Sequence, residues 1–329
     1  MTMFNNKKIL VTGGTGMIGR YLVELLLEMG AIVRVASIDD SSLAHADAEF
    51  VQTNLIDINN CLRVCDGIDY VFHLAGIKGS PAVTTKKPAS FFVPVILFNT
   101  NMMEAARQCN VQKYLYTSTI GVYHPAEVFR EDVVWKTVPS EYDRIGGWAK
   151  RMGELQAEAY AIEFDWREIC IVRPANVYGQ YDNFDYTNAM VIPSLIKRAV
   201  EGENPFVVWG DGTAIRDFIH AKDVARGMIF VMENDIYEPV NLGSGEELSI
   251  KELVETIVDC MDKKPEIVWD TDKPCGDRKR VMDMSRMRKY GFKPTVSLKE
   301  GIRDTIAWYR TQRAPHAVYN VFEEGIKID

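Results

Sequence analysis

The sequence has few of the features that mark membrane-spanning, secreted or nucleic-acid-binding proteins. No window approaches the run of about 18 apolar residues that a membrane helix needs, and the start, MTMFNNKKIL, has no long apolar signal core. The formal charge is -8 and no stretch is rich in Lys or Arg, which argues against nucleic acid or an anionic membrane as a main partner. These absences predict a soluble, cytoplasmic protein.

Cysteine and histidine are too few and too scattered to suggest a metal site. The 6 cysteines contain no Cys-x-x-Cys pair, and the 5 histidines form neither His-x-x-x-His nor His-Glu-x-x-His. We therefore expect reduced thiols and no metal.

The chain does contain a regular alternation of strand-like and helix-like segments. Strands are expected at residues 8–12, 31–36, 49–53, 70–74, 113–118 and 168–173, and helices at 20–29, 99–109 and 148–162. Such alternation predicts an α/β fold, a Rossmann-type doubly wound parallel sheet. We assign residues 1–180 to this domain, with a returning segment around 210–245, and residues 181–329 to a smaller C-terminal α/β domain that binds substrate.

A glycine-rich turn joins the first expected strand to the first expected helix. Gly13, Gly16 and Gly19 lie in this turn, and Met17 and Ile18 begin the helical pattern. Glycines here let backbone N–H groups approach a pyrophosphate at the positive end of the helix dipole. The turn therefore predicts a bound dinucleotide.

Further motifs follow in an order that resembles the extended short-chain dehydrogenase/reductase family, also called the NAD-dependent epimerase/dehydratase family. They are Gly-x-x-Gly-x-x-Gly, His73-Leu-Ala-Gly76, Arg173-Pro-Ala-Asn-Val-Tyr-Gly179 and Asn241-Leu-Gly-Ser-Gly245. The resemblance implies a nicotinamide cofactor beneath these segments. Residues 181–198 and 207–220 closely resemble GDP-L-fucose synthase and its GDP-sugar relatives.

The segment that ends the second strand favours NAD over NADP. It contains Ser37, Asp39 and Asp40, and no Lys or Arg follows to neutralise the extra phosphate of NADP. Asn54 stands where the family usually has an Asp against the adenine. The predicted cofactor-binding residues are Gly13, Gly16, Met17, Ile18, Gly19, Ser37, Asp39, Asn54, Leu55, Leu74, Ala75, Gly76, Lys150, Pro174, Asn176 and Val177.

The substrate half carries side chains suited to a nucleoside diphosphate. An Arg fork such as that of Arg216 fits a diphosphate, and an aromatic face such as that of Trp209 fits a base. The resemblance adds a closing loop in which Arg278 or Arg280 is a second diphosphate candidate. The predicted substrate-binding residues are Lys78, Asn176, Val191, Lys197, Trp209, Arg216 and Arg278.

The resemblance also implies a reaction centre, from which one group is missing. Family members use a Ser or Thr, a Tyr and a Lys, the last two spaced Tyr-x-x-x-Lys, and the Tyr moves the hydroxyl proton. Thr119, with Ser118 beside it, and Lys150 stand in the Ser/Thr and Lys places, but Gly146 stands in the Tyr place. Tyr142 is a candidate displaced substitute if the helix starts late, and His124 or Glu127 are other groups that could reach the reaction centre.

Two further replacements indicate the type of reaction. Gly121 and Met190 stand where GDP-L-fucose synthases have the Cys and His that epimerise, and neither side chain can move a proton. We therefore expect oxidation at C4 of a GDP-hexose or GDP-heptose without epimerisation. The alternatives are an epimerase or reductase with an unconventional base, and a catalytically silent homologue that binds NAD or a sugar nucleotide.

The resemblance further implies a homodimer or higher homo-oligomer, formed through the helices at 99–109 and 148–162. The apolar residues expected to offer a free face are Met102, Met103, Ala105 and Ala106.

Overall fold

A seven-stranded parallel sheet forms the centre of the molecule. The structure is a computed structural model that describes residues 2–77, 81–186, 188–273 and 276–311. In order across the sheet, the strands are β12 (Val240–Leu242), β7 (Ile169–Pro174), β5 (Lys113–Thr117), β4 (Tyr70–His73), β1 (Lys8–Thr12), β2 (Ile32–Ser37) and β3 (Glu49–Gln52). Every neighbouring pair is parallel. The strand order reverses between β1 and β4, which confirms the predicted doubly wound fold and places ligands at the carboxyl ends of these strands.

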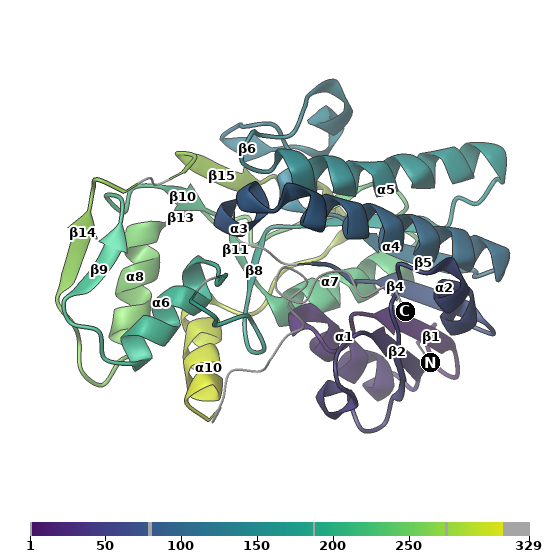
Figure 1. The fold of residues 1–329 in the computed structure, drawn as a ribbon, viewed down its shortest axis with the longest axis horizontal. Coiled ribbons are helices and arrows are strands. Elements are labelled where there is room, and N and C mark those ends of the chain that lie inside the picture. The colour runs from purple at the N-terminus through teal and green to yellow at the C-terminus, as the bar shows by residue number, and fades with distance from the viewer. Residues whose placement is uncertain (1, 78–80, 187, 274–275, 312–329) are drawn as a thin grey trace.

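Helices cover both faces of this sheet (Figure 1). One face is covered by α1 (Met17–Glu28) and α7 (Ala221–Glu233), and the other by α2 (Ile58–Cys65), α4 (Pro88–Gln108) and α5 (Arg144–Glu163). The inner strands, such as β1, β4 and β7, are buried from both sides, so they read as continuous apolar runs rather than as alternating ones.

The apolar side chains expected to form a free face on α4 lie inside the protein. Met102, Met103, Ala105 and Ala106 are each 0% exposed, so the expectation that they are available to a second copy is wrong. They pack in the core with residues of β4, β5 and α2 because α4 rests its apolar side on the sheet. The large apolar side chains that α4 and α5 do expose are Val93, Leu97, Leu155 and Ile162.

The C-terminal part is built from short strands and three helices around a separate core. One small sheet has the order β13 (Leu248–Ser249), β10 (Ile215–Arg216), β15 (Lys279–Met282) and β6 (Val128–Phe129). Two pairs are β11 (Phe218–His220) with β8 (Asn176–Tyr178), and β14 (Ile267–Asp270) with β9 (Phe206–Trp209). The core here lies among α6 (Val191–Val200), α8 (Ile250–Asp259) and α10 (Leu298–Thr311). The remaining elements are α3 (Pro81–Lys86), α9 (Ser285–Tyr290), η1 (Ser41–Leu43), η2 (Ile120–Val122) and η3 (Glu131–Lys136).

Helix α5 starts earlier than its sequence pattern predicts. It begins at Arg144 instead of Trp148 and therefore includes Gly146 and Gly147. A Cβ atom on Gly147 would lie 2.3 Å from the carbonyl oxygen of Gly121, so the glycine lets this first turn lie directly against η2. Close packing has outweighed the low helix propensity of the two glycines.

In the part of the chain that the structure describes, no helix is both long and apolar enough to cross a membrane. No group of three His, Cys, Asp or Glu side chains within the same ranges is arranged to hold a metal ion. The cysteines that the structure describes are free thiols.

Candidate active site

The glycine turn is pressed against the segment that follows β4. Gly13 has a φ of 67°, and a Cβ atom on it would lie 3.0 Å from the backbone of Ala75. A Cβ atom on Gly19 would lie 2.2 Å from the carbonyl oxygen of Gly13. Gly16 caps α1 without a side chain, so the first N–H groups of the helix, including those of Met17 and Ile18, face outward uncapped. These residues fit a dinucleotide pyrophosphate, since both the close approach and the free N–H groups that it needs are present.

A buried hydrogen-bond chain positions the residues that face this turn. Thr12 Oγ1 accepts hydrogen bonds from the N–H groups of Leu74 and Ala75, at 3.2 and 3.1 Å, and lies 2.8 Å from His73 Nδ1. His73 Nε2 lies 2.9 Å from Asn99 Oδ1. Burial, assisted by the nearby charge of Lys150, lowers the pKa of His73 to about 3. The neutral ring therefore donates from Nε2 and accepts at Nδ1, and it holds the segment from Leu74 to Gly76 over the glycine turn.

An acidic group stands at the carboxyl end of β2. Thr15 Oγ1 donates to Asp39 Oδ2 at 2.6 Å, and Ser37 Oγ donates to the same oxygen at 3.1 Å. Asp40 points elsewhere, because its carboxylate caps η1 by accepting from Ser42 N at 2.9 Å. One of the two predicted acids is thus fixed beside the glycine turn, and Thr15 is a site residue that the sequence reasoning missed.

The other predicted cofactor residues lie at the same edge of the sheet. Leu55 is buried, and Asn54 Oδ1 accepts from Ile56 N at 3.1 Å, which shapes the turn after β3. Pro174 pairs in register with Leu242 at the end of β7. Asn176 Nδ2 donates to the carbonyl oxygen of Asp217 at 2.8 Å, and Val177 follows it in β8.

Lys150 and Thr119 approach the same end of β5. Lys150 Nζ donates to the carbonyl oxygen of Thr117 at 2.9 Å, and burial lowers the pKa of Lys150 to about 8. Thr119 caps η2, and its Oγ1 accepts from Gly121 N at 3.3 Å. Both side chains are only partly buried, so they remain accessible to a ligand.

Ser118 does not join this pair. Its hydroxyl is buried and donates to Glu154 at 2.6 Å, and Glu154 forms a two-point ion pair with Arg173 at 3.0 and 2.7 Å. Arg173 continues the network to the hydroxyl of Tyr123 at 3.1 Å. The Arg of the Arg-Pro-x-Asn-Val-Tyr-Gly motif is therefore an internal support for the site, and we leave Ser118 out of the proposed catalytic set.

The space at Gly146 is occupied by an aromatic ring from α4. A Cβ atom at this position would lie 3.2 Å from Cε1 of Phe91, so a larger side chain would need the ring to move. Tyr142 is 67% exposed, which removes the reason for treating it as a displaced substitute. His124 is also exposed, with Nδ1 3.2 Å from the carbonyl oxygen of Val138, and Glu127 is exposed. None of the three is held toward Thr119 by a hydrogen bond of the described residues.

The predicted substrate residues are spread over the C-terminal part. Arg216 Nη1 donates to the carbonyl oxygen of Asp277 at 2.7 Å, which ties it to the closing loop. Arg216 and Arg280 are register partners in β10 and β15, so they project from one face of the small sheet. Arg278 is exposed and lines a hollow of about 520 Å³ with Lys279 and Thr213. This geometry favours Arg280 over the predicted Arg278 as the companion of Arg216.

Of the three candidates in α6 and β9, Lys197 is held by other residues, and Trp209 and Val191 are exposed. Lys197 Nζ donates to the carbonyl oxygen of Phe184 at 3.1 Å and lies 3.8 Å from the ring centre of Tyr186. Trp209 is 61% exposed and Val191 is 39% exposed. Lys78 lies outside the described residues.

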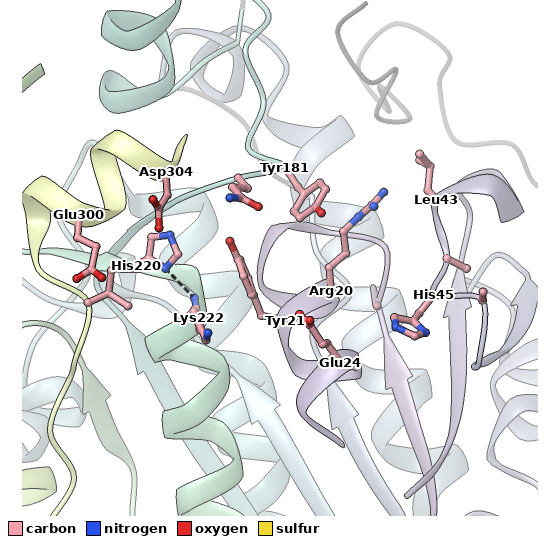
Figure 2. A pocket seen from close by; sticks show the side chains of 15 residues that line it. Arg20, Tyr21, Glu24, Leu43, His45, Tyr181, His220, Lys222, Glu300 and Asp304 are labelled. Atoms are coloured by element: carbon pink, nitrogen blue, oxygen red, sulfur yellow. Dashed lines mark hydrogen bonds between the residues drawn. The ribbon is translucent and has the colours of Figure 1, made fainter. Parts of the chain in front are cut away.

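A second hollow, of about 660 Å³, lies between α1, the segment around His45 and α10, and Gly14 of the glycine turn lines it as well (Figure 2). Figure 2 shows Arg20 and Tyr21 from α1 facing Tyr181, His220 and Asp304 across it. The guanidinium of Arg20 lies 4.3 Å from the ring centre of Tyr181, and its Nε donates to the carbonyl oxygen of Thr15 at 2.9 Å. The contact braces the glycine turn against the C-terminal part, and neither Thr119 nor Lys150 lines this hollow.

Comparison with known proteins agrees with the class of enzyme that this fold and site define. Residues 9–243 match the model of the NAD dependent epimerase/dehydratase family. A putative GDP-L-fucose synthase 2 of Arabidopsis thaliana is 30% identical over 310 residues, which are 92% of this chain and 91% of the relative. A UDP-glucose 4-epimerase of Thermotoga maritima, solved with UDP-glucose, is 29% identical with a TM-score of 0.80, covering 92% of this chain and 98% of that one. A GDP-L-fucose synthetase of Naegleria fowleri bound to NADP has 24% identity and a TM-score of 0.80, with 95% and 97% covered, and shows the fold alone.

The chain belongs to the NAD-dependent epimerase/dehydratase family and is an enzyme of the extended short-chain dehydrogenase/reductase type. The predicted resemblance to this family, and to its GDP-L-fucose synthase-like members, is confirmed.

Proposed function

We propose that this protein uses NAD to oxidise C4 of a GDP-hexose or GDP-heptose to a 4-keto sugar, without epimerising it. When bound, NAD supplies the hydride acceptor. The observation that carries the proposal is the reaction centre itself: Thr119 and Lys150 are in place, while the proton-moving positions of the relatives are occupied by Gly121, Gly146 and Met190. Redox chemistry needs a hydride acceptor and one proton acceptor, whereas epimerisation at the carbons beside a keto group needs side chains that remove and return protons there.

The cofactor preference follows from the acid at the end of β2. Asp39 is oriented by Thr15 and Ser37, as expected of a group that accepts hydrogen bonds from ribose hydroxyls. A 2′-phosphate there would meet a carboxylate, which favours NAD. Lys150 would hold the nicotinamide ribose, and its partly buried positive charge would stabilise an alkoxide-like transition state.

For the substrate, we propose that Arg216 binds the diphosphate together with Arg280 or Arg278. Lys197, Asn176 and Val191 would line the same half of the site. Trp209 would stack on the base, since its indole ring is 61% exposed and offers an aromatic face. Preference for GDP over UDP rests on the likeness to GDP-L-fucose synthases.

The test is turnover of a panel of GDP- and UDP-sugars in deuterated water, with products followed by mass and by NMR. We expect a 4-keto product with no deuterium at the carbons beside the new carbonyl. Deuterium there with inverted configuration would establish the epimerase alternative instead. If NADH reduces 4-keto sugars and NAD oxidises none of the alcohols, the protein is a reductase and the proposed direction of the reaction is wrong. Binding of NAD with no turnover of any sugar would favour a silent homologue.

Replacing Arg216 by Ala should weaken GDP-sugar binding and leave NAD binding unchanged.

A further inference from the structure

The carboxylate of Asp143, which contacts Gly121, has no role in the scheme above. Asp143 is the residue just before α5, and Gly147 and Lys150 follow it at the helix spacing of four and seven residues. Residues at these spacings share one face of a helix. Gly147 is in close contact with η2, so the face that carries Asp143 and Lys150 is turned toward η2. Tyr142, one residue earlier, is 67% exposed.

The carboxylate of Asp143 occupies the space next to Gly121. A Cβ atom on Gly121 would lie 3.4 Å from Cγ of Asp143 and 3.5 Å from its Oδ1, which is ordinary contact distance. Thr119 Oγ1 is bonded to the N–H of the same glycine. Thr119 and Asp143 therefore flank Gly121, and a longer side chain at position 121 would project toward the carboxylate.

Other side chains hold Asp143 by one oxygen. Arg280 Nη2 donates to Oδ2 at 2.6 Å, and Ser140 Oγ donates to Oδ2 at 3.4 Å. Among the described residues, Oδ1 accepts no hydrogen bond. The carboxylate is thus oriented through Oδ2 and presents Oδ1 toward Gly121. Arg280 fixes the orientation of this carboxylate, and the lone pairs of Oδ1 are available to accept the proton of a hydroxyl group.

We propose that Asp143 is the general base of this enzyme and replaces the missing Tyr. The inference rests on the proposed function. When NAD is bound, it would accept the hydride that leaves C4 with the electron pair of the C–H bond. The O–H bond of the same carbon breaks, its proton goes to Oδ1 of Asp143, and the C=O bond forms. Asp143 then releases the proton to solvent, to which its side chain is 28% exposed.

The experiment compares Asp143→Asn with Glu141→Gln in the full-length protein. Asn keeps the shape of the side chain and an oxygen for Arg280 but cannot accept the proton. We expect kcat for the GDP-sugar to fall by about 100- to 10,000-fold, with bound NAD unchanged. Glu141 is an exposed carboxylate two residues away, and its replacement should leave kcat within about twofold. In Asp143→Ala, added formate should restore part of the activity because it supplies a carboxylate in the vacated space.

The outcomes separate this proposal from the proposed function. If the wild type turns over a nucleotide sugar and Asp143→Asn retains at least a third of its kcat, the general-base role is refuted while the oxidation stands. If both Asp143 variants lose bound NAD and formate restores nothing, the carboxylate is only structural and the role is again refuted. A wild type that binds NAD but oxidises no sugar in the panel refutes both.

Discussion

The carboxylate of Asp39, at the end of β2, predicts how strongly the protein prefers NAD to NADP. A 2′-phosphate bound at the ribose site would lie within hydrogen-bonding range of the groups around Asp39, at roughly 4 Å from its carboxylate. Two unit charges at about 4 Å repel by about 4 kcal/mol at an effective dielectric constant of 20. Since about 1.4 kcal/mol corresponds to a tenfold change in affinity, we expect the wild type to bind NAD up to about 1000-fold more tightly than NADP.

Asp39→Asn removes this charge and keeps an oxygen for the hydroxyl groups of Thr15 and Ser37. The ratio of the NADP and NAD dissociation constants, measured by calorimetry, should fall by about 10- to 1000-fold, mainly through tighter NADP binding. In the wild type the ratio should also fall as salt is raised, because this repulsion is partly exposed.

Asp40→Asn is the matched control. Asp40 is exposed and its carboxylate caps η1, so its replacement should change the ratio by much less. Equal binding of NAD and NADP by the wild type would refute the reasoning. So would a ratio that stays the same in Asp39→Asn or falls as far in Asp40→Asn.

Three further predictions concern stability and assembly. Replacing Glu154 by Gln leaves the guanidinium of Arg173 buried without its charge partner, and we expect a loss of about 3–5 kcal/mol in the free energy of unfolding in urea; a loss below about 1 kcal/mol would contradict the supporting role of the pair. Burial lowers the pKa of Lys150 to about 8, so the unfolded chain binds this proton more tightly than the folded protein. The free energy of unfolding of the wild type, relative to Lys150→Met, should therefore rise by about 3 kcal/mol between about pH 8 and pH 10.5. A constant difference would show that Lys150 titrates alike in both states. We also propose a homodimer through the exposed apolar side chains of α4 and α5, such as Leu155 and Ile162. Ile162→Asp should shift sedimentation toward the monomer, and a monomeric wild type at micromolar concentration would rule the dimer out.

Local pattern was sufficient for the fold. Apolar runs, helical periodicity and the glycine turn identify β1, α1 and β2 within a few residues, because each depends on nearby residues and on burial from both faces of the sheet. The motif at Gly13 to Gly19 carries its own physical reason, since only glycine permits the contacts with Ala75 and between Gly13 and Gly19. The sequence also indicated Thr119 and Lys150 as candidate site residues, and it showed that Gly146 stands where the family has a Tyr.

Tertiary structure decided which side chains meet. The helical pattern predicts that α5 begins at Trp148, whereas it begins at Arg144. The contact that favours the earlier start joins Gly147 to Gly121, which are distant in sequence and adjacent in space. Phe91 fills the space at Gly146 from a different helix, and Arg280 reaches Asp143 from a strand more than a hundred residues later. Tyr142 and Asp143 are consecutive residues just before α5, yet Tyr142 is 67% exposed while the side chain of Asp143 contacts Gly121. Only the packing of this turn against η2 distinguishes the two residues.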